Sequence, residues 1–220
     1  MDIMKAMRAR HSVRTYTGKP IEGETLETLE KLIEECNRES GLHIQLVRNE
    51  PMAFDSVMAR YGSFSGVKNY LAMVGKKGPK LGELCGYYGE KLVLAAQTLG
   101  LNTCWVGATF KKIPDVFRVG RGEKLVIVIA IGYGTMQGTA HKSKDAAAVS
   151  KAEYAPEWFA KGVEAALLAP TAINQQKFLF TLQGEKVSAK AGFGPFSKVD
   201  LGIVKYHFEL GSGMDSSVWL

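Results

Sequence analysis

The sequence predicts a layered α+β fold in which helices pack against a sheet of short strands. Residues 24–37 form an amphipathic helical pattern, whose apolar positions recur at spacings of three and four: Leu26, Leu29, Leu32, Ile33 and Cys36. Residues 125–131 form an apolar, β-branched run before Gly132, which is typical of a central strand buried on both faces. Helical and strand patterns alternate along the chain, and this order is typical of layered folds.

The other elements follow from the same two periodicities. Further helices are expected at 2–10, with Asp2 as its cap, and at 88–99, 157–168 and 200–210. Further strands are expected at 42–48, 68–74 and 178–183. The basic segment 10–21 is expected to be extended, 102–110 to be a loop, and the residues after Gly211 to be a loose tail.

Composition and charge narrow the class of protein. The 220 residues suffice for one sizeable core or for two small halves, and 46% hydrophobic with 23% charged residues is ordinary for a globular protein. A net charge of +6 favours anionic partners such as phosphate-bearing cofactors. The chain has no run of five or more like charges, so a nucleic-acid partner is not expected.

The cysteines and the apolar runs bear on metal, membrane and compartment. Three cysteines at wide spacing, without a C-x-x-C pair, argue against a disulfide framework and against a zinc site. The N-terminal residues have no apolar core like that of a signal peptide, and the longest apolar run, 125–131, is too short to span a membrane. We therefore expect a cytoplasmic protein with no bound metal and no membrane partner.

The segment RHSVR, residues 10–14, is a candidate phosphate site. Arg10, Ser12 and Arg14 alternate, so in an extended chain their side chains point the same way. Two guanidinium groups and a hydroxyl on one side match the charge and geometry of a phosphate. His11 points the other way, although its backbone could still contact a ligand. The alternative is a solvated basic loop.

Three further segments are candidate ligand contacts, and each has a purely structural alternative. Lys142 and Lys144 alternate in AHKSK after a glycine-rich turn. This pattern indicates either ligand contacts or a solvated surface segment. Residues 102–110, NTCWVGATF, are small and apolar with one large aromatic residue, and could contact a flat apolar ligand. The alternative is that Trp105 is a residue of the hydrophobic core. APTAINQQKFLF, residues 169–180, places side-chain amides in a helix-to-strand turn, for in-plane hydrogen bonds or for ordinary turn chemistry.

A faint internal repeat is present in the order of the elements. The helix and strand at 24–37 and 42–48 recur as 157–168 and 178–183, and 87–100 matches 199–211 in character. Chance similarity of two helix–strand pairs is the alternative. The repeat predicts two halves, residues 1–149 and a shortened second half, residues 150–220.

Taken in order, these segments resemble the FMN-dependent nitroreductase family. The resemblance is carried by Arg-His-Ser-x-Arg after a short helix, Gly-Leu-Asn-Thr-Cys-Trp-x-Gly after a buried helix, and a buried strand leading into Gly-Tyr and Lys-x-Lys. APTAINQQKFLF is similar to the family's Ala-Pro-Ser-x-x-Asn-x-Gln-Pro-Trp-x-Phe turn. The resemblance covers most of the chain and is that of a divergent, internally repeated member similar to the thermophile-type nitroreductases. It implies a three-layer α/β/α fold with a mixed sheet and a pseudo-dimeric repeat.

The resemblance also implies a set of FMN-binding residues. Arg10, His11, Ser12 and Arg14 would hold the phosphate and ribityl chain, and Lys142 and Lys144 would add positive charge. The backbone of Trp105, Val106 and Gly107 would meet flavin N5, and Lys68 and Asn69 would face the pyrimidine edge of the ring. The signature turn would contribute Thr171, Asn174 and Gln176.

Two departures from the family pattern shape the expected assembly. The family carries its Asn-x-Gln turn after the first long helix, near residues 37–43, where this chain has NRESGLH; the turn occurs in the second half instead. In typical members the turn comes from a partner subunit. We therefore expect one FMN between the two halves of one chain and a functional monomer, with a homodimer as the alternative. The second departure is Lys177-Phe178 in place of Pro-Trp, which affects the substrate side.

The expected activity is electron transfer from NADH or NADPH through FMN to a small organic acceptor, such as a nitro compound or a quinone, by a ping-pong mechanism. The chemistry would be the cofactor's own, so no catalytic side chain is assigned. One alternative is a non-catalytic flavin-binding protein, a store or a sensor. Another is a basic protein that has lost flavin and binds RNA or an acidic protein.

Overall fold

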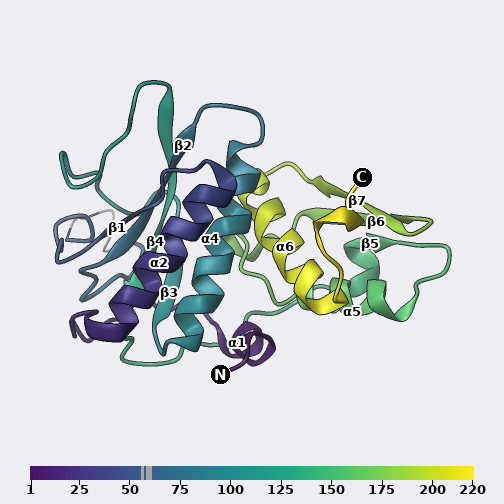
Figure 1. Cartoon of the computed structure of the whole chain (residues 1–220). Helices are drawn as coiled ribbons and strands as arrows, with labels where there is room; N and C mark the ends of the chain where they lie inside the picture. The colour runs from purple at the N-terminus through teal and green to yellow at the C-terminus, as the bar shows by residue number, and fades with distance from the viewer. Residues whose placement is uncertain (56, 58–60) are drawn as a thin grey trace. The chain divides into compact units, whose positions relative to one another are not determined.

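The computed structural model describes residues 1–55, 57 and 61–220, which form two compact units. Unit 1 comprises Met1–Leu81 and Lys91–Thr139, and unit 2 comprises Gly82–Glu90 and Ala140–Leu220. The described residues form five α-helices and two sheets, which confirms the predicted α+β class. Helix α4 (Leu81–Thr98) contributes residues to both units (Figure 1). The predicted internal repeat and the boundary between 149 and 150 stay predictions.

The sheet of unit 1 has the strand order β1-β2-β4-β3, and all neighbouring strands are antiparallel. Its strands are β1 (Gln45–Val47), β2 (Tyr70–Lys76), β4 (Glu123–Gly132) and β3 (Asn102–Val106). Strand β4 lies between β2 and β3, and its residues from Ile127 onward are buried. The prediction that the apolar run 125–131 is a central strand is therefore confirmed.

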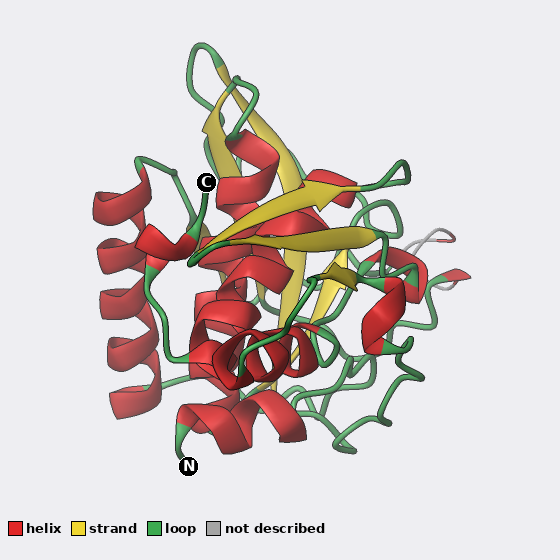
Figure 2. Ribbon diagram, turned by 90° about the vertical axis from the view of Figure 1, so that its right-hand side faces the viewer, coloured by secondary structure: helices red, strands yellow, loops and turns green. Residues whose placement is uncertain are grey.

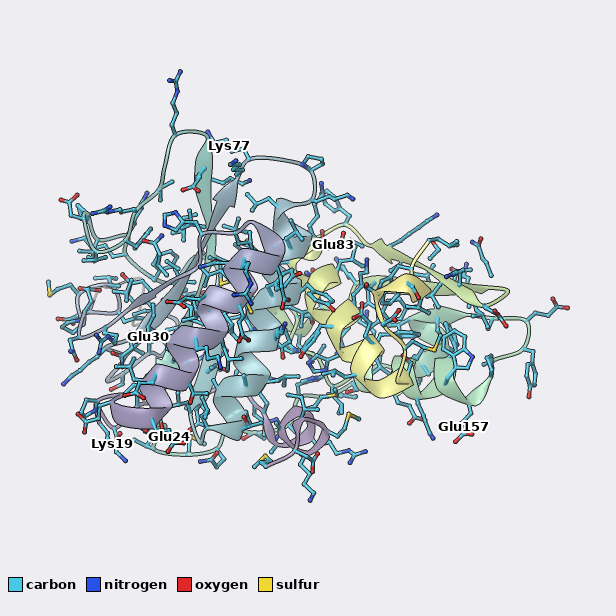
Figure 3. The ribbon with its side chains drawn as sticks, in the orientation of Figure 1. Lys19, Glu24, Glu30, Lys77, Glu83 and Glu157 are labelled. Carbon is cyan, nitrogen blue, oxygen red and sulfur yellow. The ribbon has the colours of Figure 1, made fainter. Side chains whose placement is uncertain are left out.

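Two helices at the start of unit 1 follow their sequence signals closely. Helix α1 (Ile3–Ala9) begins at the expected cap, because the Asp2 carboxylate accepts a hydrogen bond of 2.9 Å from the Lys5 N–H. Helix α2 (Gly23–Ser40) ends at Gly41, which has a φ of 68°. Helix α2 buries Leu29, Ile33 and Cys36, whereas the exposed Glu24 and Glu30 are labelled on this helix in Figure 3.

Aromatic side chains form a hydrophobic cluster on one face of this sheet. Phe54 packs edge-on against Phe64 and Tyr70, with ring centroids 5.2 and 5.8 Å apart. Phe117 packs edge-on against Tyr70 at 6.5 Å. Val13 and Tyr16 belong to the same cluster, as do Cys104 and Val106 of β3. The basic N-terminal segment is thus anchored in the core by the apolar residues that interrupt its polar ones.

Unit 2 has a small sheet with the order β5-β6-β7, shown as yellow arrows in Figure 2. Strand β5 (Ser150–Lys151) pairs parallel with β6 (Phe178–Gln183), which pairs antiparallel with β7 (Lys186–Ala191). Helices α5 (Glu157–Ala166) and α6 (Ser197–Ser212) belong to this unit, together with 3₁₀ turns η1 (Ala146–Ala148), η2 (Ala172–Asn174) and η3 (Ser216–Val218). Phe159, Phe180 and Phe208 are fully buried at its centre.

Three sequence expectations about elements were wrong. Residues 102–106 are strand β3 rather than loop, because β4 supplies a pairing partner that the local sequence does not reveal. Helix α4 begins at Leu81 rather than near residue 88, since its glycines obscure the helical pattern. The C-terminal residues are not loose: Val218 is buried, and the Leu220 N–H donates to the Val187 carbonyl at 3.1 Å. Strand β7 was not predicted.

Candidate functional site

The segment that begins at Arg10 is extended, as predicted, and hydrogen bonds hold it on several sides. The Val13 N–H donates to the Thr103 carbonyl at 3.0 Å, and Ser12 forms a parallel bridge with Thr103. The Tyr16 N–H donates to Ser65, and the Thr17 N–H donates to Tyr133, both at 2.9 Å. The segment therefore lies along β3 and has a fixed direction, although the main sheet itself is antiparallel.

Arg10, Ser12 and Arg14 all influence the thiol of Cys104 on strand β3, Ser12 by a hydrogen bond and the two arginines by their charge. Burial raises the pKa of Cys104, and Arg14, a hydrogen bond with Ser12 and Arg10 oppose that rise. Arg10 is buried at the end of helix α1, whereas Arg14 is exposed. Two guanidinium groups and a hydroxyl form a set of donors whose charge suits a phosphate.

A glycine-rich loop packs against this segment. A side chain at Gly138 would place its Cβ 2.8 Å from the Cβ of His11 and 3.0 Å from the carbonyl oxygen of Ser12. The buried Asn102 fixes the same loop, because its Oδ1 accepts from the Gly134 N–H and its Nδ2 donates to Gln137 Oε1, both at 3.0 Å. The roles of Asn102 and Gly138 were missed at the sequence level. The signals were the Asn that begins NTCWVG and the glycines after β4.

Lys68 and Asn69 lie at the entry to β2 and have different surroundings. Lys68 is exposed, and its Nζ lies against Gly18, where an added Cβ would be 3.4 Å away. Asn69 is buried, and its Oδ1 accepts a hydrogen bond of 3.1 Å from the Asn49 N–H. The Asn69 oxygen therefore holds the chain between β1 and β2, which leaves Lys68 as the charged group of this pair.

Trp105, Val106 and Gly107 mark the end of strand β3. Trp105 is half-buried and pairs with Ile129, and Val106 is buried and pairs with Val128. Gly107 follows the last paired residue and is half-buried. The backbone beyond Val106 thus leaves the sheet at the predicted N5 contact.

In unit 2, hydrogen bonds bring the signature turn together with the Lys142–Lys144 segment. Gln176 is buried, and its Nε2 donates to the Lys142 carbonyl at 2.9 Å and to Asn174 Oδ1 at 2.8 Å. Its Oε1 accepts from the Lys144 N–H at 2.9 Å, and its backbone N–H donates to Thr171 Oγ1 at 3.0 Å. The Lys144 ammonium donates to the carbonyls of Gln175 and Gln176 at 2.9 and 3.0 Å.

Most polar groups of the turn take part in hydrogen bonds, some within the turn and others to residues 142–144 and to Asp200. Asn174 is exposed and donates to the Lys142 carbonyl at 2.9 Å, and the Lys142 side chain is exposed. The buried Gln176 amide and the Lys144 ammonium are used in hydrogen bonds between the turn and residues 142–144. The Asn174 amide also belongs to this network, because its Oδ1 accepts from Gln176 Nε2, but Asn174 and Lys142 are exposed and are therefore the members placed to meet a ligand.

Asp200, in the first turn of helix α6, lies beneath the signature turn and was missed at the sequence level. Its Oδ1 accepts from the Ala172 N–H at 2.9 Å, and its Oδ2 accepts from Gln175 Nε2 at 2.7 Å. Burial raises the pKa of Asp200 to about 6, although the hydrogen bonds from Gln175 and Ala172 lower it. The sequence signal was an Asp at an apolar position of the helix, in VDLGIV.

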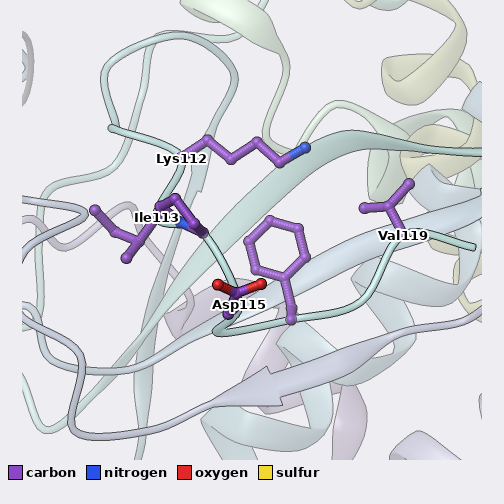
Figure 4. Close-up of a pocket in the computed structure, with 6 residues that line it drawn as sticks. Lys112, Ile113, Asp115 and Val119 are labelled. Atoms are coloured by element: carbon purple, nitrogen blue, oxygen red, sulfur yellow. The ribbon is translucent and has the colours of Figure 1, made fainter.

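A shallow depression of about 370 Å³ lies elsewhere in unit 1, within the loop between β3 and β4 (Figure 4). Its lining residues are Lys112, Ile113, Pro114, Asp115, Phe117 and Val119. None of the predicted site residues lines it. Over the residues that the structure describes, no helix is long and apolar enough to cross a membrane.

Comparison with solved structures identifies the fold. The fold is similar to a crystal structure described as a putative nitroreductase from Thermotoga maritima, with a TM-score of 0.69 and 22% identity over 96% of this chain and 83% of that chain. It is also similar to an FMN-dependent nitroreductase from Clostridium difficile, with a TM-score of 0.52 and 17% identity over 63% and 91% of the two chains. A third, described as a putative nitroreductase in complex with FMN from Desulfovibrio desulfuricans, has a TM-score of 0.53 and 18% identity over 70% and 98%.

The fold is thus that of the nitroreductases. Residues 2–212 match the family model described as "Putative TM nitroreductase", and the chain belongs to this family. No curated protein matches the chain.

Proposed function

We propose that this protein is an FMN-dependent oxidoreductase, which passes electrons from NADH or NADPH to a small organic acceptor such as a nitro compound or a quinone. The observation that carries the proposal is the family match over residues 2–212. Two proteins of similar fold are described as FMN-dependent or as bound to FMN, which supports the choice of cofactor. The donor set of unit 1 supports it independently, because it suits a phosphate.

In this proposal Arg10, Ser12 and Arg14 hold the FMN phosphate, and the backbone of His11 lies next to the ribityl chain. The charges of Arg10 and Arg14 lie beside the same buried thiol, so they would reinforce each other at one anion. The backbone at Gly107 would donate toward flavin N5. Lys68 is exposed and would supply positive charge near the pyrimidine edge, whereas Asn69 would hold the backbone beside it.

The turn of unit 2 would present Asn174 to the cofactor, with Lys142 as an added positive charge. Thr171, Gln176 and Lys144 would act indirectly, because their side chains hold the turn and the segment 142–144 in place. We also propose a cytoplasmic monomer with one FMN per chain.

When bound, FMN supplies the chemistry, since it accepts a hydride from the nicotinamide and passes electrons to the acceptor. The protein's own residues bind and orient the cofactor, and no side chain needs to act as a nucleophile or as a metal ligand. Reductant and acceptor would use the same exposed face in turn, which gives a ping-pong mechanism.

One observation favours a second candidate, a flavin-binding store or sensor without efficient turnover. Where the family has Pro-Trp, this chain has Lys177 and Phe178. The Lys177 ammonium donates to the Phe193 carbonyl at 3.1 Å, and the Phe193 side chain is 98% exposed. These residues change the side of the turn that would face a substrate, so binding without efficient turnover is a distinct outcome.

Two measurements on the purified protein test the proposal. We expect the protein, purified in the presence of FMN, to be yellow, with the visible spectrum of oxidised flavin. We expect anaerobic NADH or NADPH to bleach that spectrum within seconds to minutes, and addition of a quinone to restore it. A colourless protein that does not take up FMN would refute the cofactor. Bound flavin that neither reductant bleaches would favour the store or sensor.

A further inference from the structure

We propose that Asp200 is a positioning residue, which holds the turn 171–176 in the conformation that the turn needs to contribute to FMN binding. The proposal rests on the proposed function. Asp200 does not belong to the signature turn in sequence, because it lies 24 positions after Gln176, and its carboxylate does not need to touch the cofactor. It would act through the backbone and the side chain that it holds.

The turn needs hydrogen bonds from outside it because several of its residues have an unfavourable backbone conformation. Ile173, Asn174 and Gln176 have φ values of 48°, 53° and 44°, in the left-handed region that residues with a Cβ avoid. Ile173 is β-branched, for which this region is a marked outlier, and its side chain is 87% exposed, so packing does not hold it there. Such outliers persist only where the surroundings impose them.

The Asp200 carboxylate ties the turn at two points by such hydrogen bonds. Its Oδ1 accepts from the Ala172 N–H at 2.9 Å, directly before the strained residues. Its Oδ2 accepts from Gln175 Nε2 at 2.7 Å, and the same Nε2 donates to the Pro195 carbonyl at 2.8 Å. Asp200 is 3% exposed and lies in the first turn of helix α6, so the tie has a rigid base.

The tie extends from the turn to the neighbouring basic segment. Gln176 follows Gln175 directly and binds the carbonyl of Lys142 and the N–H of Lys144. A turn that relaxes at Ala172 and Gln175 would therefore also release Asn174 and Lys142. Removal of the Asp200 carboxylate would therefore displace Asn174 and Lys142, which we assign to FMN binding, through these hydrogen bonds.

The protonation state of Asp200 decides how many acceptors it offers. The ionised carboxylate accepts both hydrogen bonds, whereas protonation puts a hydrogen on an oxygen that faces a donor. The groups that act on Asp200 are its burial, Gln175 Nε2 and the Ala172 N–H, and no charged side chain is among them. Asp200 is thus the titrating group of this contact.

The first test compares Asp200→Asn with Asp115→Asn, an exposed position in unit 1 that loses the same charge. We expect Asp200→Asn to increase hydrogen exchange at the Ala172 and Gln176 amides and to weaken FMN binding about tenfold, whereas Asp115→Asn changes neither. Gln175→Ala removes the Oδ2 partner at a half-exposed position and keeps the Asp200 charge. We expect it to weaken FMN binding in the same direction, and the double variant to lose less than the sum of the two, because both changes remove the hydrogen bond between Gln175 and Asp200.

The second test measures the pH midpoint of the Ala172 amide shift by NMR, without and with saturating FMN. If the ionised carboxylate orders the turn for FMN, then FMN favours that form and lowers the midpoint, by reciprocity. A rise would overturn the proposal, because FMN would then favour the protonated carboxyl. An unchanged midpoint, or unaltered FMN affinity in Asp200→Asn and Gln175→Ala, overturns the proposal and leaves FMN binding intact. A wild-type protein that binds no FMN refutes the proposed function instead. Hydrogen exchange at the Ala172 amide then still tests whether Asp200 holds the turn.

Discussion

Burial raises the pKa of two acids beside the candidate site residues, Cys104 in unit 1 and Asp200 in unit 2. Cys104 stays a neutral thiol even though Arg14 and Arg10 oppose the shift, so it acts as a small apolar residue and not as a nucleophile. The pKa of Asp200 rises only to about 6, so this carboxyl changes charge within an accessible pH range.

The raised pKa of Asp200 predicts that the free energy of unfolding depends on pH. Its folded pKa of about 6 lies above its ordinary value of 3.8, so the folded state binds the proton more tightly. Its contribution to stability is then complete below pH 4 and is lost as the pH rises to 6. The difference corresponds to about 3 kcal/mol in the free energy of unfolding. Urea unfolding of wild type and Asp200→Asn between pH 4 and 7 measures it; equal slopes for the two proteins would contradict the prediction.

The proposed role of Arg14 predicts that its substitution weakens FMN binding. Arg14 is exposed, so Arg14→Gln should remove a charge-assisted hydrogen bond without disturbing the core. We expect FMN binding to weaken by about 1.5–3 kcal/mol, the usual range for hydrogen bonds to charged groups. Arg8→Gln is the matched control, since Arg8 is exposed on helix α1 and lies outside the site. Fluorescence titration of FMN compares them, and equal affinities would remove Arg14 from the site.

Close backbone contact between helices organises unit 2 at the scale of its elements. An added Cβ at Gly86 of α4 would lie 2.0 Å from the Val199 carbonyl oxygen, and one at Gly202 of α6 would lie 2.0 Å from that of Glu83. Lys205 and Glu83 form an ion pair of 2.7 Å across the same two helices. Glycine spacing thus lets α6 lie directly on the first half of α4, and it explains why that half of the helix gave a weak signal in the sequence.

Gly202→Ala should therefore destabilise unit 2, because the methyl group can be accommodated only if the helices move apart. We expect a loss of about 1–3 kcal/mol or more, as for other overpacked cores. Gly78→Ala is the control, since an added Cβ there meets nothing within 4 Å. Thermal unfolding followed by circular dichroism compares the two variants. If Gly202→Ala were as stable as Gly78→Ala, the close contact would not limit the packing of these helices.

At the scale of the whole molecule, the candidate site residues divide into two sets. Arg10, His11, Ser12 and Arg14 belong to unit 1, with Lys68, Asn69 and residues 105–107. Lys142, Lys144 and the turn residues belong to unit 2. Each set is ordered by contacts within its own unit. Our proposal of a functional monomer requires both sets to serve one FMN in the same chain.

Stoichiometry and mass together test that proposal. We expect one FMN per chain and, by light scattering after gel filtration, a mass near that of the 24.0 kDa chain. A mixture of an Arg14→Gln chain with a Gln175→Ala chain should then bind FMN as weakly as either variant alone. Recovery of wild-type affinity in the mixture, or an obligate dimer, would show that the two sets come from different chains.

The arrangement of the candidate site residues was predictable where the local sequence fixes the direction of the side chains, and their role in binding FMN stays a prediction. Alternation in RHSVR singled out Arg10, Ser12 and Arg14 because an extended chain directs every second side chain alike, and all three influence the Cys104 thiol. Asn102 and Asp200 were missed because their roles depend on partners far along the chain, Gly134 in one case and Ala172 in the other. Nothing near either residue in the sequence indicates such a partner.

The sequence by itself determined the α+β class, helix α1 with its Asp2 cap, helix α2, the central strand β4 and the family resemblance, because these depend on periodicity and on short motifs. Only the tertiary structure decided that 102–106 is a strand and that the C-terminal residues pack against β7. It also decided that the Gln176 amide is used in hydrogen bonds within its own turn and to Lys142. Strand pairing and the satisfaction of buried polar groups are contacts between distant residues, and a local pattern specifies the residue but not its partner.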